Sequence, residues 1–491
     1  MEGADLAQRR IVVAANRGPV SFHDDPSGEP VVARGPGGLV TVLTEVLRHH
    51  PGTWVAAALS DAERRLAAEQ RAVEVALDGE EYRVRYVAPS PEAYNKYYNI
   101  VANPMLWFIQ HYLWDLGRHP DIGANELDAW YNGYLVVNEL FAKAVADEVG
   151  RHAGDALVLL HDYQLYCVAR DVRDACPSTF LQQFVHIPWP QSDYWRVLPT
   201  PIREAVFRGL LGNDIVAFHT RHYVSNFLRC CADLLDLEVD ETRGVVRHDG
   251  REVWARAYPV SIDPASLRDA ADSARAHAAE RELRSRRREF LLLRVDRLDL
   301  SKNIIRGFHA LDRFLELHPE FKERLTFLAL LQPSREDVEE YVTYRERVER
   351  IVADVNTHHG TTDWMPIDLR IQDDFPITLA AYAQYDVLLV NAISDGLNLV
   401  AKEGPILNRH DGVLVLSEYA GAYEELGAFA LGVNPFDIEG QAEALHRALT
   451  MSADERADRA GMLRRVVEEN SVEKWVQAQF SDIAAKLAAD A

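Results

Sequence analysis

A short apolar segment, followed by a glycine turn and helix-forming residues, constrains the fold more than any other stretch of the chain. Residues 385–391 form a β-branched, apolar run of the kind found in buried parallel strands. Gly396 ends that run, and good helix formers follow at 399–402. Such a turn gathers free backbone N–H groups and the positive end of a helix dipole, which together can bind a phosphate or diphosphate. An ordinary strand–helix junction with an acidic first turn fits the same pattern, so the turn alone leaves the ligand open.

Two acidic residues flank this turn and suit a sugar nucleotide. Asp395 precedes the glycine and can accept hydrogen bonds from sugar hydroxyls. Glu403, expected on the first helical turn, can reach a ribose diol. Gly37 and Gly38 open another expected helix, where the backbone could approach a phosphate closely.

Strand-like and helix-like segments alternate along the whole chain. This alternation predicts a doubly wound parallel sheet, and its restart after 258–264 predicts a second one. We expect an α/β protein with two Rossmann-like domains facing a cleft, residues 1–260 and 261–470, and a C-terminal helix, 471–491, returning to the first domain. The expected strands are 10–19 (ending in a polar turn), 156–160, 180–185, 214–218, 290–293, 325–331, 387–390 and 413–416.

Length, charge and cysteine content narrow the class of protein. A chain of 491 residues is too long for one typical core, and 26% charged residues are ordinary for a globular protein. The net charge of -23 disfavours nucleic acids and anionic membranes as partners. No apolar run approaches a membrane span, the N-terminus lacks a signal-peptide pattern, and the four cysteines lack metal-ligand spacing. We therefore expect a cytoplasmic enzyme or binding protein.

Polar side chains follow two of the expected strands. His161 and Asp162 come after one strand and His186 after the next. Ligands of open α/β sheets bind beyond the carboxyl ends of the strands, so these side chains fall where chemistry is expected. A single histidine at such a strand end is often structural.

Two expected helix starts carry cations. Ser301 is expected as an N-cap with Lys302 in the first turn, and Ser334 as an N-cap with Arg335 in the first turn. The helix dipole disfavours a cation there by ~0.3–1 kcal/mol, and a bound phosphate would reverse that penalty. Arg297 stands just before the first start, so the pattern predicts two anion clamps, although each cation could equally extend into water.

The motifs taken together resemble the trehalose-6-phosphate synthases, which are retaining GT-B glycosyltransferases. The likeness runs from about Arg10 to the C-terminal helix, in order and with compatible spacing. The residues that carry it are Arg17, Gly37-Gly38, Tyr98 to Trp107, His161-Asp162-Tyr163, His186-Ile187-Pro188-Trp189-Pro190, Arg297 to Lys302, Pro333-Ser334-Arg335 and Asp395 to Glu403.

The resemblance implies that glucose moves from a nucleoside diphosphate-glucose to the anomeric hydroxyl of glucose 6-phosphate, with retention, to form α,α-trehalose 6-phosphate. It implies no cofactor and often a homodimer or homotetramer. The implied donor-binding residues are Gly37, Gly38, Arg297, Lys302, Asp395, Asn398, Leu399, Val400, Ala401, Lys402 and Glu403. The implied acceptor-binding residues are Arg17, Tyr98, Trp107, Asp162, Ile187 and Arg335. Catalytic roles fall to Arg297, Lys302, His186 and Asp162, with His186 and Asp395 contacting the transferred glucose.

The residue types suit this chemistry. The sequence has no Asp-x-Asp pattern of the kind that holds a metal in other sugar transferases, so Arg297 and Lys302 would stabilise the charge that develops on the leaving diphosphate. No carboxylate stands out as a nucleophile, which fits a front-side displacement in which the departing phosphate oxygen takes the acceptor's proton.

Two departures from the family pattern keep alternatives open. Asp296 stands where Glu is expected and Asn303 where Gly is usual, and Trp189 with 191–195 resembles validoxylamine-type pseudo-glycosyltransferases. Those relatives lack parts of the donor-sugar signature that this chain retains. Glucosylglycerol-phosphate synthesis, pseudo-glycosyl coupling and a non-enzymatic sugar-phosphate-binding regulatory subunit remain as alternatives, and the donor base (UDP, GDP or ADP) stays open.

Overall fold

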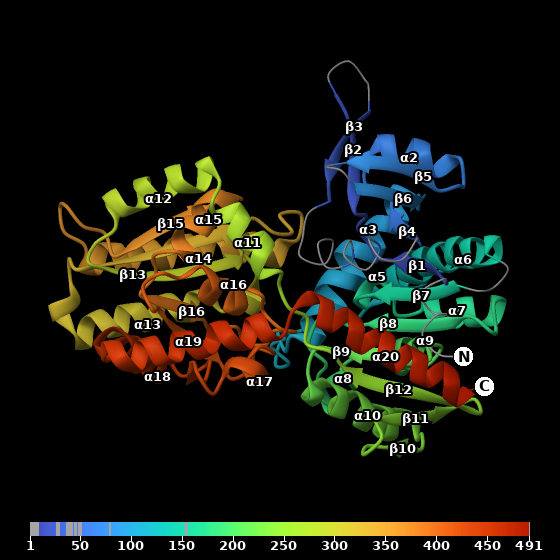
Figure 1. Cartoon of the computed structure of the whole chain (residues 1–491). Coiled ribbons are helices and arrows are strands. Elements are labelled where there is room, and N and C mark those ends of the chain that lie inside the picture. Colours follow the sequence, from blue (N-terminus) through green and yellow to red (C-terminus); the bar gives the residue numbers. More distant parts are fainter. Residues whose placement is uncertain are drawn as a thin grey trace. The chain divides into compact units, whose positions relative to one another are not determined.

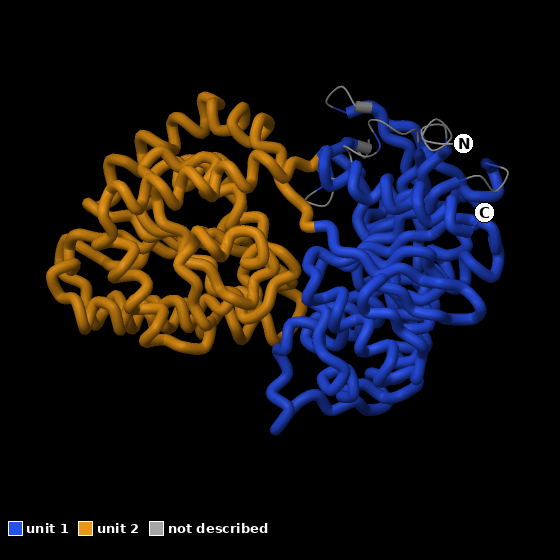
Figure 2. The backbone as a smooth tube through the Cα atoms, turned by 60° about the horizontal axis from the view of Figure 1, so that its bottom comes forward, with its two compact units in different colours: residues 1–258, 473–491 blue, residues 259–472 orange. Residues whose placement is uncertain are grey.

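The computed structural model describes residues 9–25, 30–35, 43, 47, 52–77, 80–152 and 156–490. Its contacts divide the chain into two compact units, which Figure 2 colours separately. Unit 1 comprises residues 1–258 and 473–491, and unit 2 comprises residues 259–472. Gly37, Gly38 and most of the helix expected to follow them lie outside the described residues.

Unit 1 is built on a ten-stranded sheet in the order β10-β11-β12-β9-β8-β7-β1-β4-β6-β5 (Figure 1). The seven strands from β12 to β6 run parallel, and the outer strands pair antiparallel. A separate hairpin joins β2 and β3. The strands are β1 (Arg10–Ala14), β2 (Val20–Asp24), β3 (Pro30–Arg34), β4 (Gly52–Ala57), β5 (Val73–Leu77), β6 (Glu80–Val87), β7 (Ala156–His161), β8 (Phe180–Phe184), β9 (Ile215–Phe218), β10 (Val239–Asp240), β11 (Val245–His248) and β12 (Arg251–Ala257).

The helices of unit 1 include two π-helical stretches, η2 and η3. The C-terminal helix α20 packs on this unit, because Gln182 Nε2 donates to Gln479 Oε1 (2.7 Å) and Trp475 Nε1 to the carbonyl of Tyr258 (3.1 Å). The helices are α2 (Asp61–Ala68), α3 (Pro91–Asn95), η2 (Lys96–Trp107), α4 (Phe108–Gln110), α5 (Ala124–Ala129), η3 (Trp130–Tyr134), α6 (Leu135–Arg151), η4 (Tyr163–Leu165), α7 (Val168–Ala175), α8 (Ser192–Trp195), α9 (Thr200–Leu210), α10 (Arg221–Leu235) and α20 (Val472–Asp490).

Unit 2 is a six-stranded, wholly parallel sheet in the order β15-β14-β13-β16-β17-β18. Helices α13, α14 and α18 cover one buried face with an apolar core, and α12, α15 and α16 pack in a second group. The strands are β13 (Phe290–Arg297), β14 (Leu325–Gln332), β15 (Ile367–Ile371), β16 (Val387–Val390), β17 (Val413–Ser417) and β18 (Leu431–Val433). The helices are α11 (Pro264–Ala271), α12 (Ala274–Arg286), η5 (Leu300–Lys302), α13 (Ile304–Leu317), η6 (Pro319–Phe321), α14 (Glu339–His359), α15 (Phe375–Tyr382), α16 (Val400–Leu407), α17 (Tyr423–Leu426), α18 (Ile438–Thr450) and α19 (Ala453–Glu469).

Both sheets have the doubly wound order, with the strand order reversing beside the first strand of each unit. In unit 1 the chain adds β4 and β6 on one side of β1 and then β7 on the other. In unit 2 it adds β14 and β15 on one side of β13 and then β16 on the other. At such a reversal point, the loops that follow two neighbouring strands lead to opposite faces of the sheet. Ligands of doubly wound sheets bind in the crevice between those two loops.

The strands predicted from the sequence are present, and the predicted α/β class is confirmed. Strands β2 to β6, β10 to β12, β15 and β18 were not predicted. Most of them mix polar and apolar residues and give no clear apolar run, whereas β4 and β18 are mostly apolar segments that were missed. Two predicted helix starts are wrong. Helix α13 begins at Ile304 rather than Ser301, and α14 begins at Glu339 rather than Ser334.

Candidate active site

The reversal point of unit 2 lies between the loops that follow β13 and β16. Arg297 is the last residue of β13, and Asp395 follows β16 on a loop that leads into α16. Lys302 lies beside Asp395, since its ammonium contacts a carboxylate oxygen of that residue. Asn398, with a positive φ of 87°, also donates to Asp395 (3.0 Å). The predicted cation and the predicted sugar-binding carboxylate therefore meet at one point.

The loop that carries Lys302 is a 3-10 turn, and its cap is Asp299, not Ser301. Asp299 Oδ1 accepts from the backbone N–H of Ser301 (2.9 Å). Asn303 then takes a left-handed conformation with φ 58°, which separates the turn from α13. Its side-chain amide donates to the carbonyls of Asn391 (2.9 Å) and Pro435 (2.7 Å). Asparagine tolerates this conformation better than most residues, so the departure from the usual glycine keeps the turn and adds two hydrogen bonds.

A fully buried arginine, Arg294, which was not predicted from the sequence, holds the backbone of the loop that carries Lys302. Arg294 donates to the carbonyls of Lys302 (2.9 Å) and Ile304 (3.2 Å), and it forms an ion pair with Asp296 (2.9 Å). Burial raises the pKa of Asp296, although Arg294 and Lys302 act in the opposite direction. A charged residue inside an otherwise apolar strand was the signal that could have found Arg294.

The start of α16 presents the amides predicted to bind a diphosphate. The helix begins at Val400, within the predicted helix-forming residues 399–402, and Leu399 is its N-cap. Asn398 Oδ1 accepts from the N–H of Ala401 (3.2 Å). The first N–H groups of a helix have no carbonyl partner within it, so those of Leu399 and Val400 are suited to an anionic ligand.

Two charged side chains on α16 have specific partners within unit 2. The Lys402 ammonium is buried and contacts the carbonyl of Val260 (2.9 Å) and Glu425 (2.6 Å). Burial lowers the pKa of Lys402, which Glu425 opposes. Burial raises the pKa of Glu403, whose carboxylate accepts from the hydroxyl of Tyr382 (2.9 Å). Lys402 therefore anchors α16 to residue 260 and to Glu425.

The second predicted cation, Arg335, does not lie in a first helical turn. It precedes α14 in a left-handed conformation with φ 50°, and Val338 occupies the N-cap position. Its guanidinium contacts Asp299 (2.8 Å) and the hydroxyl of Tyr341. Asp299 also caps the turn that carries Lys302. The buried carboxylate of Asp299 therefore contacts both predicted anion-binding segments, the Lys302 turn and Arg335.

The reversal point of unit 1 lies between the loops that follow β1 and β7. Arg17 follows β1 and is exposed, and its carbonyl accepts from Trp54 Nε1 (3.1 Å). Asp162 follows β7 with φ 73°, and its Oδ1 accepts from the backbone N–H of His186 (3.3 Å). Two of the predicted acceptor residues thus border the crevice that the strand order predicts.

The π-helix η2 adds two further predicted residues, Tyr98 and Trp107. Tyr98 stacks on Tyr94 (5.6 Å between centroids), which in turn accepts a hydrogen bond from Asn16 beside Arg17. The Trp107 ring lies 5.6 Å from that of Tyr163, the residue after Asp162. Ile187, next to His186, is buried. The π-helix was not predicted, although such helices are rare and often occur at functional sites.

His186 is the middle member of a chain of three imidazoles, of which those of His161 and His219 are buried. His161 Nδ1 lies 3.0 Å from His186 Nε2, and His186 Nδ1 lies 3.3 Å from His219 Nε2. His219 Nδ1 reaches the carbonyl of Tyr258 at 3.4 Å, which makes His219 Nδ1 the donor and sets the direction of the chain. Both ring nitrogens of His186 are therefore engaged within unit 1, and His219 was not predicted.

The chain of three imidazoles makes the free energy of unfolding of the protein depend on pH. Burial lowers the pKa of His161 to about 3, and burial followed by His219 and His161 lowers the pKa of His186 well below its usual value. Unfolding raises both pKa values to near the ordinary histidine value of about 6.5. Below that pH the unfolded protein binds protons that the folded protein does not, so the free energy of unfolding is greatest above about pH 6.5 and falls as the pH is lowered. We expect the melting temperature to fall between pH 6.5 and 5, and His186→Gln to flatten that fall. An unchanged slope in the variant would contradict a His186 that stays neutral in the folded protein.

Residues 9–485 match the model of glycosyltransferase family 20. The chain belongs to that family. The resemblance stated from the sequence motifs is thus confirmed at the level of the family.

Relatives with assigned activities include two kinds of family 20 enzyme. The chain is 32% identical over 483 residues to a validamine 7-phosphate valienyltransferase of Streptomyces hygroscopicus subsp. jinggangensis, covering 98% of this chain and 95% of the relative. It is 31% identical over 486 residues to the UDP-forming α,α-trehalose-phosphate synthase 2 of Aspergillus niger, covering 96% of each.

Solved family 20 structures have the same fold. A UDP-forming α,α-trehalose-phosphate synthase from Burkholderia vietnamiensis superposes with a TM-score of 0.83 at 28% identity, covering 99% of this chain and 98% of that one. A trehalose-6-phosphate protein from E. coli bound with UDP-2-fluoro glucose superposes with a TM-score of 0.82 at 28% identity, covering 97% and 99%. The predicted GT-B fold is confirmed. No helix among the described residues combines the length and apolarity needed to cross a membrane.

Proposed function

We propose that this family 20 glycosyltransferase is an α,α-trehalose-phosphate synthase, which transfers glucose from a nucleoside diphosphate-glucose to glucose 6-phosphate with retention. The observation that carries the proposal is the match, over almost the whole length of both chains, to UDP-forming trehalose-phosphate synthases. UDP is the favoured donor nucleotide because those relatives are named as UDP-forming.

The reversal point of unit 2 is proposed to bind the donor. Arg297, Lys302 and the amides of Leu399 and Val400 would bind the diphosphate, and Asp395 would bind the transferred glucose. Glu403 would bind the ribose, and its contact with Tyr382 would orient it. Lys402 is assigned a positioning role, because its ammonium is engaged by residue 260 and Glu425.

The reversal point of unit 1 is proposed to bind the acceptor. Arg17 and Tyr98 would contact its phosphate, and Asp162 would accept from its hydroxyls. The family resemblance also assigns Arg335 to the acceptor. Trp107 and Ile187 would shape the pocket that selects the α anomer. His186 is assigned a positioning role beside Asp162, because both of its ring nitrogens are engaged by His161 and His219.

These residues suit a displacement on one face of the sugar. Cleavage of the donor's anomeric C–O bond leaves the electron pair on a diphosphate oxygen, while the acceptor's anomeric hydroxyl oxygen forms the new bond on the same face. The hydroxyl proton passes to the departing phosphate oxygen. Preorganised cations and amides stabilise the developing negative charge, and orientation of both substrates supplies much of the rate.

The decisive experiment is a panel of substrates with product masses as readout. UDP-, GDP- and ADP-glucose are each combined with glucose 6-phosphate, glycerol 3-phosphate or a cyclitol phosphate. We expect a disaccharide phosphate from UDP-glucose and glucose 6-phosphate. A product formed only with glycerol 3-phosphate would support glucosylglycerol-phosphate synthesis instead, and no turnover with any pair would support a regulatory subunit.

A second candidate, valienyl transfer, is favoured by the 32% identity to the validamine 7-phosphate enzyme. It predicts turnover with a nucleotide-activated cyclitol and a cyclitol phosphate, and none with a nucleotide-glucose. A nucleotide-activated cyclitol, added to the panel as a fourth donor, separates this candidate from both the synthase and the regulatory subunit.

Arg335→Gln tests which clamp holds the acceptor. Loss of hydrogen bonds to a charged group should raise the KM for glucose 6-phosphate by about 10- to 100-fold. The dissociation constant for UDP-glucose, measured by calorimetry, should change little. A collapse of donor affinity with normal acceptor affinity would mean that Arg335 supports the Lys302 turn through Asp299 and does not contact the acceptor.

A further inference from the structure

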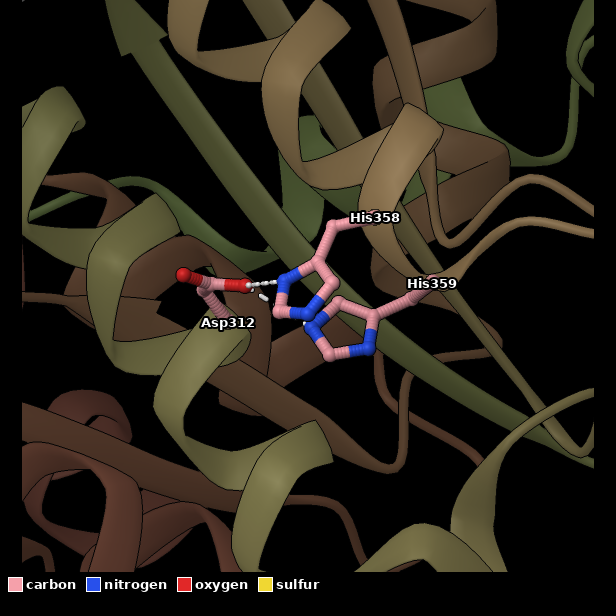
Figure 3. Close-up of side chains that lie close together, drawn as sticks. All are labelled: Asp312, His358 and His359. Carbon is pink, nitrogen blue, oxygen red and sulfur yellow. Dashed lines mark hydrogen bonds and ion pairs between the residues drawn. The ribbon is translucent and has the colours of Figure 1, made fainter.

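A group of three metal-ligand side chains lies on unit 2 outside the reversal point. Asp312 comes from α13, and His358 and His359 end α14 (Figure 3). Both imidazoles approach the same carboxylate oxygen of Asp312, His358 through Nδ1 at 3.2 Å and His359 through Nε2 at 2.8 Å. The His359 side chain is 1% exposed and that of His358 is 56% exposed, so the group has one buried wall and one open side.

The spacing of these atoms suits a small divalent cation. Zinc binds imidazole nitrogen and carboxylate oxygen at about 2.0–2.2 Å in tetrahedral sites, so neighbouring ligand atoms lie about 3.3 Å apart. The two contacts with Asp312 are 2.8 and 3.2 Å, and all three ligand atoms lie within 4.8 Å of one another. A shift of a few tenths of an ångström would therefore open the space for the ion.

We propose that Asp312, His358 and His359 bind Zn2+, with water as the fourth ligand, and that the ion joins the end of α14 to α13. A plain cap of the α14 dipole would need only one histidine near the helix end. Here both imidazoles converge on one carboxylate oxygen from another helix, so three side chains of the types that bind zinc already lie together.

The location separates this site from glucosyl transfer. Asp312 lies eight residues along α13 from its first residue, Ile304, a rise of about 12 Å from the end that adjoins the Lys302 turn. The ion would therefore stabilise the α13–α14 pair of unit 2 without contacting either substrate, and the inference does not depend on the proposed function.

A second group of the same residue types offers a matched control. His318, Glu320 and His446 also come within reach of one ion. The His318 and His446 rings stack almost parallel at 3.7 Å between centroids, and His318 Nδ1 lies 3.3 Å from Glu320 Oε1. His318→Asn therefore removes a nearby metal-ligand side chain from unit 2 without changing the Asp312 group.

The test uses the full chain after removal of metals with a chelator. Zinc chloride is titrated calorimetrically, and Co2+ is used as a spectroscopic probe of tetrahedral coordination. We expect one equivalent to bind, with a rise in melting temperature. His358→Asn, at an exposed position, should weaken binding by at least about 100-fold, since even changes to a metal ligand's own hydrogen-bond partners cost 10- to 100-fold. Asp312→Asn should act likewise, and His318→Asn should bind as the wild type does.

Three results would overturn the inference. The wild type could show no saturable zinc binding. The wild type and His358→Asn could bind zinc equally well, or only His318→Asn could lose binding. Circular dichroism of each variant establishes that the fold is retained, and turnover with UDP-glucose and glucose 6-phosphate should be the same with and without zinc.

Discussion

Replacing Lys302 with alanine should lower kcat for glucose transfer by about 100- to 1000-fold, the range found when one preorganised donor to a developing negative charge is removed. The 3-10 turn and Arg294 hold the Lys302 backbone, so the ammonium is fixed beside Asp395 before substrate binds. Such preorganisation makes the cation effective, because no reorganisation is needed when the diphosphate departs. Initial rates at saturating UDP-glucose and glucose 6-phosphate measure the effect.

Arg313→Ala is the control for this variant. Arg313 is a partly exposed cation of α13, paired with Glu439 and Glu316 on the surface, and its loss should leave kcat within about twofold, as surface ion pairs contribute little. A Lys302→Ala enzyme with near-normal kcat would show that the diphosphate is stabilised elsewhere. Because the proposed clamp is made of protein cations, transfer should also persist in the presence of a chelator, and its abolition would contradict the clamp.

Replacing Arg294 with methionine should destabilise unit 2 by about 3–5 kcal/mol, the cost of removing one partner of a buried ion pair. Its side chain is fully buried, and its loss would leave the buried carboxylate of Asp296 without the guanidinium and free two carbonyls of the Lys302 turn. Gly307 of α13 leaves the room for it, since a Cβ there would lie 2.5 Å from Arg294 Nη1. Urea unfolding of the full chain, followed by circular dichroism, measures the loss.

A second substitution separates the unpaired charge from the lost packing. Adding Asp296→Leu to Arg294→Met removes the unpaired carboxylate and should recover part of the stability, because an uncompensated buried charge is the larger cost. A loss below about 1 kcal/mol in Arg294→Met would contradict the buried network. The Arg313→Ala variant, at a partly exposed position, again serves as the reference.

The strands and the strand–turn–helix at 387–407 were predictable because their signals are local. An apolar, β-branched run such as Val387–Val390 is buried in almost any compact arrangement, and a glycine turn followed by helix formers starts a helix nearby. The residues at the ends of β1, β7, β13 and β16 were predictable for the same reason, since a polar residue after a buried strand is visible in the sequence. Motif resemblance predicted the family.

The helix starts at Ser301 and Ser334 were predicted wrongly because the capping pattern is local and the structure that decides it is not. Asn303 holds its left-handed turn through carbonyls 88 and 132 residues away. Arg335 turns toward Asp299, 36 residues before it, and α14 starts only after that contact is made. A local pattern of a serine followed by a good helix former carries no information about these distant partners.

The sequence by itself determined which segments are buried strands, which turns are polar and which family the chain belongs to, because period, apolarity and motif spacing act over a few neighbouring residues. Only the tertiary structure decided that β1 lies beside β7 and β13 beside β16, that three histidines form one chain, and that Arg294 supports the Lys302 turn. The physical reason is that a buried polar group must find its partner in space, and the free energy of that pairing depends on residues far apart in the chain.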